Sequence, residues 1–111
     1  MLDNPNTANT QATLRILTQN VRKSPTALAE VVNNAPGRNI DIALLQEIPF
    51  KTSGQLTASQ HWSVILPATH TVNSRRTRTA ILVRSQLATS GWEEIITKSG
   101  DATGIRLRTN I

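Results

Sequence analysis

The chain contains no cysteine, and aromatic side chains make up only 3% of its 111 residues. Without cysteine it can form no disulfide, offers no thiolate nucleophile and has no thiolate ligands for a zinc site. A base-stacking platform of the kind that single-strand-binding proteins use is poorly supported by so few aromatic rings. Any chemistry must therefore come from carboxylates, amides, hydroxyls, imidazoles and cationic side chains.

Long hydrophobic runs are also missing. No apolar stretch approaches the roughly 20 residues that a membrane-spanning helix needs. The first residues, MLDNPNTANTQAT, show neither the basic nor the apolar region of a secretory signal. We therefore expect an intracellular protein with no membrane partner, in which residues 1–13 form a mobile leader.

The residues that are present describe one small globular domain with a basic surface. Hydrophobic residues make up 38% of the chain and charged residues 17%, which is enough for one modest core. The chain has twelve basic residues, nine of them arginine, and seven acidic residues, which gives a formal net charge of +5. Arginine grips phosphate oxygens with a planar fork, so this balance favours a polyanionic partner. The alternative is a basic surface that only interacts with solvent.

The first half of the chain predicts a strand, a helix and a second strand. Leu14–Val21 is a short apolar run expected to form a buried strand, and Ile40–Gln46 is nearly continuous in apolar residues, as in a strand covered on both faces. Between them, Ser24 can cap a helix that starts at Pro25, and Pro36-Gly37 ends it. Such a βαβ unit is almost always right-handed, and its two strands are parallel.

The second half predicts strands alone. Four segments are enriched in β-branched residues, and Ser99-Gly100-Asp101 supplies turn residues for a hairpin between the last two. These segments are His61–Leu66, Thr77–Ser85, Trp92–Lys98 and Thr103–Thr109. The predicted fold class is therefore α/β (α+β), with a βαβ unit followed by about four mostly antiparallel strands in a mixed sheet.

Two polar residues stand at the carboxyl ends of the predicted parallel strands. Asn20 follows the first strand and Glu47 follows the second, so both are expected at one edge of the sheet, where open α/β sheets bind ligands. A carboxylate beside a neutral amide is a plausible seat for a divalent cation and the phosphate it carries. The alternative is a turn asparagine and a solvated glutamate at a strand end.

These motifs carry a resemblance to a known family. The segment ILTQNVRKS, followed by a helix and then DIALLQE, resembles the opening of the endonuclease/exonuclease/phosphatase superfamily. The subset it is most similar to is the apurinic-type endonuclease domain of non-LTR retrotransposons. The similarity continues through TRTAILVRSQLATSGWEEI and SGDATGIRLRT, so it spans Leu14 to about Thr109.

The resemblance implies a two-layer α/β sandwich that hydrolyses phosphodiester bonds. In this reading Asn20 and Glu47 are catalytic, and Glu47 also holds Mg²⁺, with Mn²⁺ as a substitute. DNA is the implied substrate, and the nucleus is the compartment that goes with it. A phosphatase or lipid phosphodiesterase branch of the same superfamily is less favoured because of the arginine-rich surface.

The later motifs of that family have no counterpart here. An Asn-x-Tyr strand, an Asp-x-Asn pair and a Ser-Asp-His triplet are all expected after Ile111, so residues 14–111 resemble a domain without its C-terminal half. His61 and His70 have no acidic neighbour in sequence and are interpreted as structural or exposed. We expect weak or absent catalysis from the chain alone. The alternative is a non-catalytic remnant that at most binds nucleic acid.

A set of cationic residues is the predicted nucleic-acid-binding surface. Contacts between such side chains and phosphates would position a substrate without reading its bases. As an alternative, the same side chains would only keep loops soluble. The residues are Arg22, Lys23, Arg75, Arg76 and Arg78.

Overall fold

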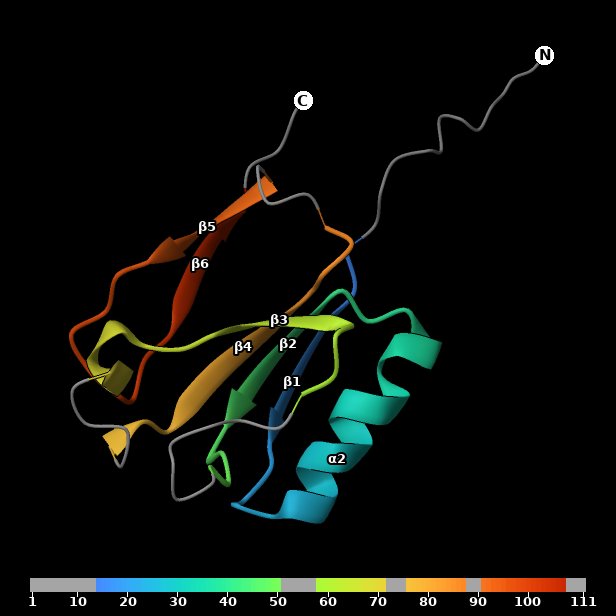
Figure 1. Cartoon of the computed structure of the whole chain (residues 1–111), viewed down its shortest axis with the longest axis horizontal. Helices are drawn as coiled ribbons and strands as arrows, with labels where there is room; N and C mark the ends of the chain where they lie inside the picture. Colours follow the sequence, from blue (N-terminus) through green and yellow to red (C-terminus); the bar gives the residue numbers. More distant parts are fainter. Residues whose placement is uncertain (1–13, 51–57, 72–75, 88–90, 108–111) are drawn as a thin grey trace.

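The computed structural model of the chain describes residues 14–50, 58–71, 76–87 and 91–107 (Figure 1). In these residues the fold is mixed α/β, with one α-helix, a four-stranded sheet and a two-stranded sheet. This confirms the predicted fold class. The predicted leader, residues 1–13, and Arg75 lie outside the described residues.

Every predicted strand and the predicted helix is present, each within or close to its expected range. The observed elements are β1 (Ile16–Asn20), α2 (Pro25–Asn34), the 3₁₀ turn η1 (Pro36–Arg38), β2 (Ile42–Gln46), β3 (Trp62–Ile65), the 3₁₀ turn η2 (Ala68–Thr71), β4 (Thr79–Arg84), β5 (Trp92–Ile95) and β6 (Gly104–Leu107). None of the helical segments in the described ranges has the length and apolar character to cross a membrane.

The four-stranded sheet has the order β1-β2-β4-β3. Strands β1 and β2 are parallel, in a register that runs from Ile16 opposite Ile42 to Asn20 opposite Gln46. Strand β4 is antiparallel to both β2 and β3. The βαβ prediction is therefore confirmed, and the carboxyl end of β2 lies between the carboxyl end of β1 and the start of β4.

Helix α2 begins as its sequence predicts. The Ser24 hydroxyl accepts a hydrogen bond from the Ala27 N–H at 3.1 Å, and Pro25 occupies the first turn, where its missing N–H costs nothing. The end differs from the predicted Pro36-Gly37 stop in one detail. The left-handed residue that reverses the chain is Asn39, with φ 59°, one residue after the 3₁₀ turn η1. Asparagine adopts this conformation more readily than most residues.

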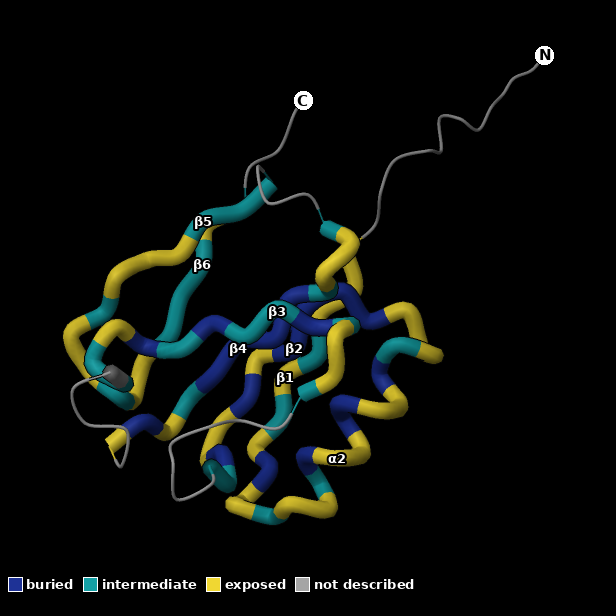
Figure 2. Tube along the Cα trace, viewed as in Figure 1, coloured by how far each residue is buried: buried dark blue, intermediate teal, exposed yellow. Residues whose placement is uncertain are grey.

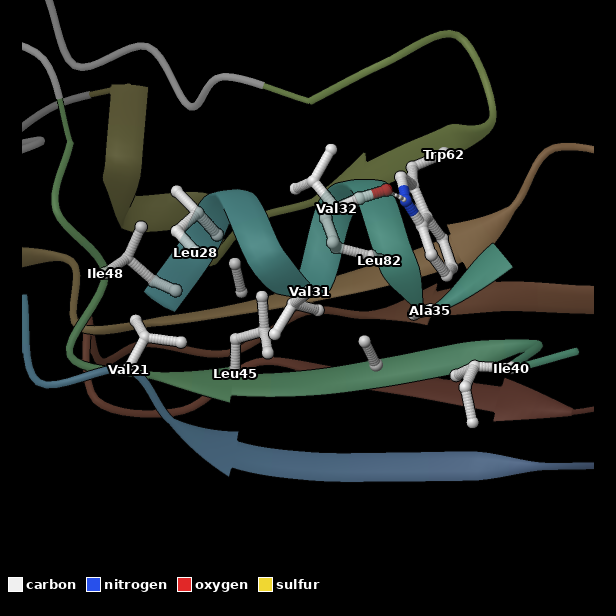
Figure 3. Packing of buried hydrophobic residues seen from close by; sticks show 12 residues of the cluster. Val21, Leu28, Val31, Val32, Ala35, Ile40, Leu45, Ile48, Trp62 and Leu82 are labelled. Carbon is white, nitrogen blue, oxygen red and sulfur yellow. Dashed lines mark hydrogen bonds between the residues drawn. The ribbon is translucent and has the colours of Figure 1, made fainter. Parts of the chain in front are cut away.

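One face of the sheet packs against α2 and forms the larger core (Figure 3). Trp62 is buried there, and its indole Nε1 donates to the Val32 carbonyl at 3.1 Å. In a continuous helix the N–H four residues later would bond that carbonyl, but residue 36 is a proline and has none. The tryptophan therefore supplies a donor that the helix sequence lacks.

The opposite face is only partly covered. The β5–β6 pair packs on a cluster of buried residues from β2, β3 and β4, whereas described residues on the β1 side of this face are exposed (Figures 1 and 2). Ile16 is 50% exposed and Leu44 is 36% exposed. The expectation of a buried first strand is therefore wrong, because β1 is an edge strand with one uncovered face. The expectation that Ile40–Gln46 is covered on both faces holds for Ile42 but not for Leu44.

A buried ion pair closes the end of the sheet opposite to Asn20. The Asp41 carboxylate lies 2.8 Å from Arg84 Nη2 and also accepts the Arg15 N–H at 3.0 Å. The Asp41 side chain is only 8% exposed, and each of its two oxygens has a partner inside the protein. This pairing fixes β1, β2 and β4 to one another at that end.

Candidate functional site at the ends of two parallel strands

Asn20 and Glu47 meet at the carboxyl ends of β1 and β2. The Asn20 Nδ2 donates to Glu47 Oε2 at 2.5 Å, although the two residues are 27 positions apart in the chain. Both side chains are exposed. The structure thus brings together the two residues that the sequence places at one sheet edge, and it does so through the parallel pairing that the βαβ unit imposes.

The orientation of the Asn20 amide is fixed by a second contact. Its Oδ1 accepts a hydrogen bond from the Arg22 N–H at 2.8 Å. Because a backbone N–H requires an acceptor, the oxygen must face Arg22 and the NH₂ group must face Glu47. Asn20 therefore acts as a donor toward the Glu47 carboxylate and holds one of its two oxygens.

The backbone of Glu47 is held on both sides. Its N–H donates to the Arg78 carbonyl at 2.7 Å, and its own carbonyl accepts the Lys23 N–H at 2.7 Å. Glu47 has a φ of 54°, a left-handed conformation that costs a non-glycine residue about 1 kcal/mol or more. On a regular strand residue 47 would face the opposite side from Gln46. The left-handed turn ends the strand and carries the carboxylate to the Asn20 side chain.

The two cations that follow Asn20 form a tight turn beside the carboxylate. Arg22 and Lys23 both have positive φ angles, 52° and 57°, and both are exposed. The Ser24 N–H then bonds the Val21 carbonyl at 2.9 Å, which closes the turn into α2. Because Lys23 bonds the backbone of Glu47 directly, this cationic turn is part of the same edge.

Two further cations lie on the other side of Glu47. Arg76 and Arg78 are exposed, and Arg78 gives its carbonyl to the Glu47 N–H. The Arg78 Nε lies 3.3 Å from Asp101 in the β5–β6 connection, with both side chains 71% exposed. Of the five predicted nucleic-acid-binding residues, Lys23 and Arg78 bond the Glu47 main chain and Arg22 bonds Asn20. Arg76 lies two positions before Arg78, and Arg75 lies outside the described residues.

The oxygen ligands available at this edge determine which kind of cation can bind. In the described ranges no group of three or more His, Cys, Asp and Glu residues is placed to hold a metal ion. Glu47 offers one carboxylate whose second oxygen is not engaged by Asn20. Magnesium keeps several waters and is commonly held by one or two carboxylates plus substrate phosphate, so a single exposed glutamate fits Mg²⁺ or Mn²⁺ and would not fit a fully protein-ligated ion.

The two histidines have different surroundings. His61 lies at the far end of the sheet, where its carbonyl accepts the Ser85 N–H at 2.7 Å. The His70 Nδ1 is 2.8 Å from the hydroxyl of Thr77, which is buried, and its ring centroid lies 5.0 Å from that of Phe50. The His61 contact involves only its main chain, so the structural interpretation of both histidines stays a prediction.

The two side chains of the candidate site are exposed at the strand ends. Two grooves, of about 160 and 560 Å³, flank α2, and neither is lined by Asn20 or Glu47. The carboxylate instead stands on an open strand end between two cationic segments. An open site of this kind is accessible to a long polymer as well as to a small molecule.

Sequence reasoning missed two contributors to this edge. Asp101 is the ion-pair partner of Arg78, and Gly100 accepts the Arg78 N–H through its carbonyl at 2.8 Å. The Ser99-Gly100-Asp101 signal identified a turn, but no local pattern shows which strand a turn will contact. Comparison with family models, curated proteins and solved structures gives no match to this chain.

Proposed function

We propose that Asn20 and Glu47 belong to the divalent-metal centre of a phosphodiesterase that nicks DNA by hydrolysis. The observation that carries the proposal is the 2.5 Å hydrogen bond between Asn20 Nδ2 and the Glu47 carboxylate at the carboxyl ends of two parallel strands. The resemblance to retrotransposon-type endonucleases agrees with it. A nuclear location goes with this substrate and is part of the proposal.

Each residue has a defined part in this proposal. Glu47 anchors the cation through the carboxylate oxygen that faces away from Asn20. Asn20 donates to the other oxygen and so keeps the carboxylate in one orientation without adding charge. When bound, Mg²⁺ or Mn²⁺ would offset the negative charge that develops on the phosphoryl and leaving oxygens.

The surrounding charge supports a polyanionic substrate. Arg22 and Lys23 follow β1, and Arg76 and Arg78 precede β4, which are the two strands on either side of β2; all four residues are exposed. A phosphate backbone that crosses the strand ends would pass from one cationic pair, over the carboxylate, to the other. Such contacts weaken as salt rises, because binding releases condensed counterions from the DNA.

The proposal includes a second part of the same domain as a partner. The resemblance implies that further segments supply the general base and the group that positions the nucleophile. We therefore expect the 111-residue chain to bind a cation and DNA, and to nick DNA weakly or not at all until those segments are added.

A second candidate function is nucleic-acid binding without catalysis. It is favoured by the exposed cations and by the single carboxylate at the site, which leaves most of the metal coordination to water. In that case the arginines alone would account for DNA affinity. The two candidate functions differ in one respect: the phosphodiesterase needs the cation and Glu47 for activity, whereas the DNA-binding protein needs neither for its affinity.

The experiment follows Mn²⁺ binding and plasmid nicking in parallel. In ¹⁵N-labelled protein, Mn²⁺ should broaden the resonances of Glu47 and the Asn20 side-chain amide first, and Glu47→Gln should abolish this selective broadening. Glu94→Gln, which removes an exposed glutamate on β5, is the matched control and should leave it intact. Nicking of supercoiled plasmid is measured with the 111-residue chain and with the chain extended by the proposed further segments of the domain. Any nicking should depend on Mg²⁺ and on Glu47. DNA binding that ignores both the cation and Glu47→Gln would instead establish the non-catalytic function.

A further inference from the structure

The connection between β5 and β6 reaches the candidate site through a chain of main-chain hydrogen bonds. The Gly100 carbonyl accepts the Arg78 N–H at 2.8 Å, and the Arg78 carbonyl accepts the Glu47 N–H at 2.7 Å. Gly100 is therefore two backbone bonds away from the residue that carries the carboxylate. Strands β5 and β6 form a separate sheet, so this contact is not a consequence of strand pairing with β4.

The approach of this connection to β4 requires glycine. A Cβ atom at position 100 would overlap the carbonyl group of Arg76 and would lie 3.1 Å from the Cα of Thr77. Both obstacles are backbone atoms, which cannot rotate away as a flexible side chain would. Any larger residue at position 100 must push the 76–78 segment away from the turn.

Two side-chain contacts hold the same connection in place. The Thr79 and Thr103 hydroxyls are 2.6 Å apart, in a partly buried position. The Asp101 carboxylate pairs with the Arg78 guanidinium at 3.3 Å on the surface. The turn is thus attached to the start of β4 by main-chain, hydroxyl and ionic contacts together.

We propose that the 99–101 turn is a positioning element for the candidate metal carboxylate, with Gly100 as its key residue. The inference rests on the proposed function of Glu47. Glu47 sits in a left-handed conformation that needs support from its surroundings, and the Arg78 carbonyl supplies half of its main-chain support. By fixing Arg78, the turn fixes the N–H of Glu47 and, with it, the direction in which the carboxylate points.

The test compares Gly100→Ala with Gly37→Ala in the full chain. A Cβ at Gly37 meets nothing within 4 Å, so this control makes the same chemical change without a clash. The first measurement, in the absence of any cation, is the ¹⁵N spectrum and the hydrogen-exchange rate of the Glu47 amide. The second is Mn²⁺ affinity, measured well below the melting temperature of each variant. Thr103→Val, which removes only the hydroxyl pair, provides a milder change to the same contact.

In Gly100→Ala we expect shifted Glu47 and Asn20 side-chain resonances, faster exchange at Glu47 and a loss of about tenfold in Mn²⁺ affinity. Thr103→Val should change the same resonances less, and Gly37→Ala should leave them unchanged. The inference is overturned if folded Gly100→Ala and Thr103→Val proteins keep the wild-type Glu47 and Asn20 resonances and differ only in melting temperature. A wild-type protein that shows no Mn²⁺ response would overturn the proposed function instead, and the cation-free spectra would still decide the positioning role.

Discussion

Asn20 donates to Glu47 and accepts from the Arg22 N–H, so its amide group links a strand end, a cationic turn and a carboxylate. The amide contributes no charge to this arrangement. A negatively charged side chain at position 20 would keep the acceptor for Arg22 but would face Glu47 with a like charge. Substitutions at position 20 can therefore test whether a divalent cation binds at the Asn20–Glu47 pair.

The substitution Asn20→Asp should make the stability of the protein depend on divalent cations. In EDTA the two carboxylates repel each other, and the melting temperature should fall by a few degrees. With Mn²⁺ the two acids can share one ion, and the loss should be recovered. Thermal unfolding with and without Mn²⁺ measures this. The control Asn20→Ala, which loses the hydrogen bond without adding charge, should gain no more from Mn²⁺ than wild type does, and an equally small response in Asn20→Asp would contradict the prediction.

The substitution Asp101→Asn should strengthen DNA binding. It frees the Arg78 guanidinium from its surface ion pair beside the candidate site and raises the net charge by one. We expect affinity for a short duplex to rise a few-fold at low salt, with a steeper dependence on salt concentration. Fluorescence anisotropy at several salt concentrations provides the measurement.

The matched control for this prediction is Glu93→Gln. It removes the same charge from a similar exposed pair, Glu93–Arg106, at 3.2 Å on the β5–β6 sheet. If position matters, Asp101→Asn should have the larger effect. Equal effects of the two variants would mean that DNA responds only to net charge.

The substitution Asp41→Asn should destabilise the fold by about 2 kcal/mol, because it leaves the Arg84 guanidinium without its charged partner in a largely buried position. Urea unfolding measures the change. Asp101→Asn removes a carboxylate from a pair that is 71% exposed on both sides, so its free energy of unfolding should stay within about 0.5 kcal/mol of wild type. Similar losses in both variants would show that burial does not set the value of the Asp41 pair.

The substitution Trp62→Phe should cost about 2 kcal/mol, because it removes volume from the core and leaves the Val32 carbonyl without the indole donor. Proline at position 36 is the reason that this carbonyl lacks its usual helical donor. In a Pro36→Ala background, a backbone N–H becomes available, and the cost of Trp62→Phe should be smaller. A double-mutant cycle in urea measures the coupling, and additive losses would rule out this explanation of the Trp62 contact.

The βαβ unit could be predicted from sequence because its signals are local. Ser24-Pro25 marks the start of the helix, and short connections force β1 and β2 to be parallel. That pairing was enough to predict that Asn20 and Glu47 share one edge of the sheet, whereas their direct contact also depends on the left-handed turn at Glu47. The antiparallel β5–β6 hairpin was predictable for the same reason, from its turn residues.

The features that escaped prediction all depend on contacts between distant segments. The edge position of β1 depends on which strands pair with β2, and no residue of β1 encodes that. The Asp41–Arg84 pair and the contact of Gly100 with Arg76 join segments 43 and 24 residues apart by their numbers. The left-handed turn at Glu47 also runs against the preference of glutamate, so only the surrounding structure explains it.

Main-chain hydrogen bonds on both sides of residue 47 hold its backbone in place independently of its side chain. Since the main chain there is bonded to Arg78 on one side and Lys23 on the other, its path does not rely on the carboxylate. Residue 47 can therefore be substituted without a change in the backbone path. Aspartate and asparagine tolerate the left-handed conformation best, so both would lower its conformational cost. Aspartate would keep the acid on a shorter side chain, and asparagine would remove it. Differences among such variants would then report on the head group itself and not on a rearranged loop.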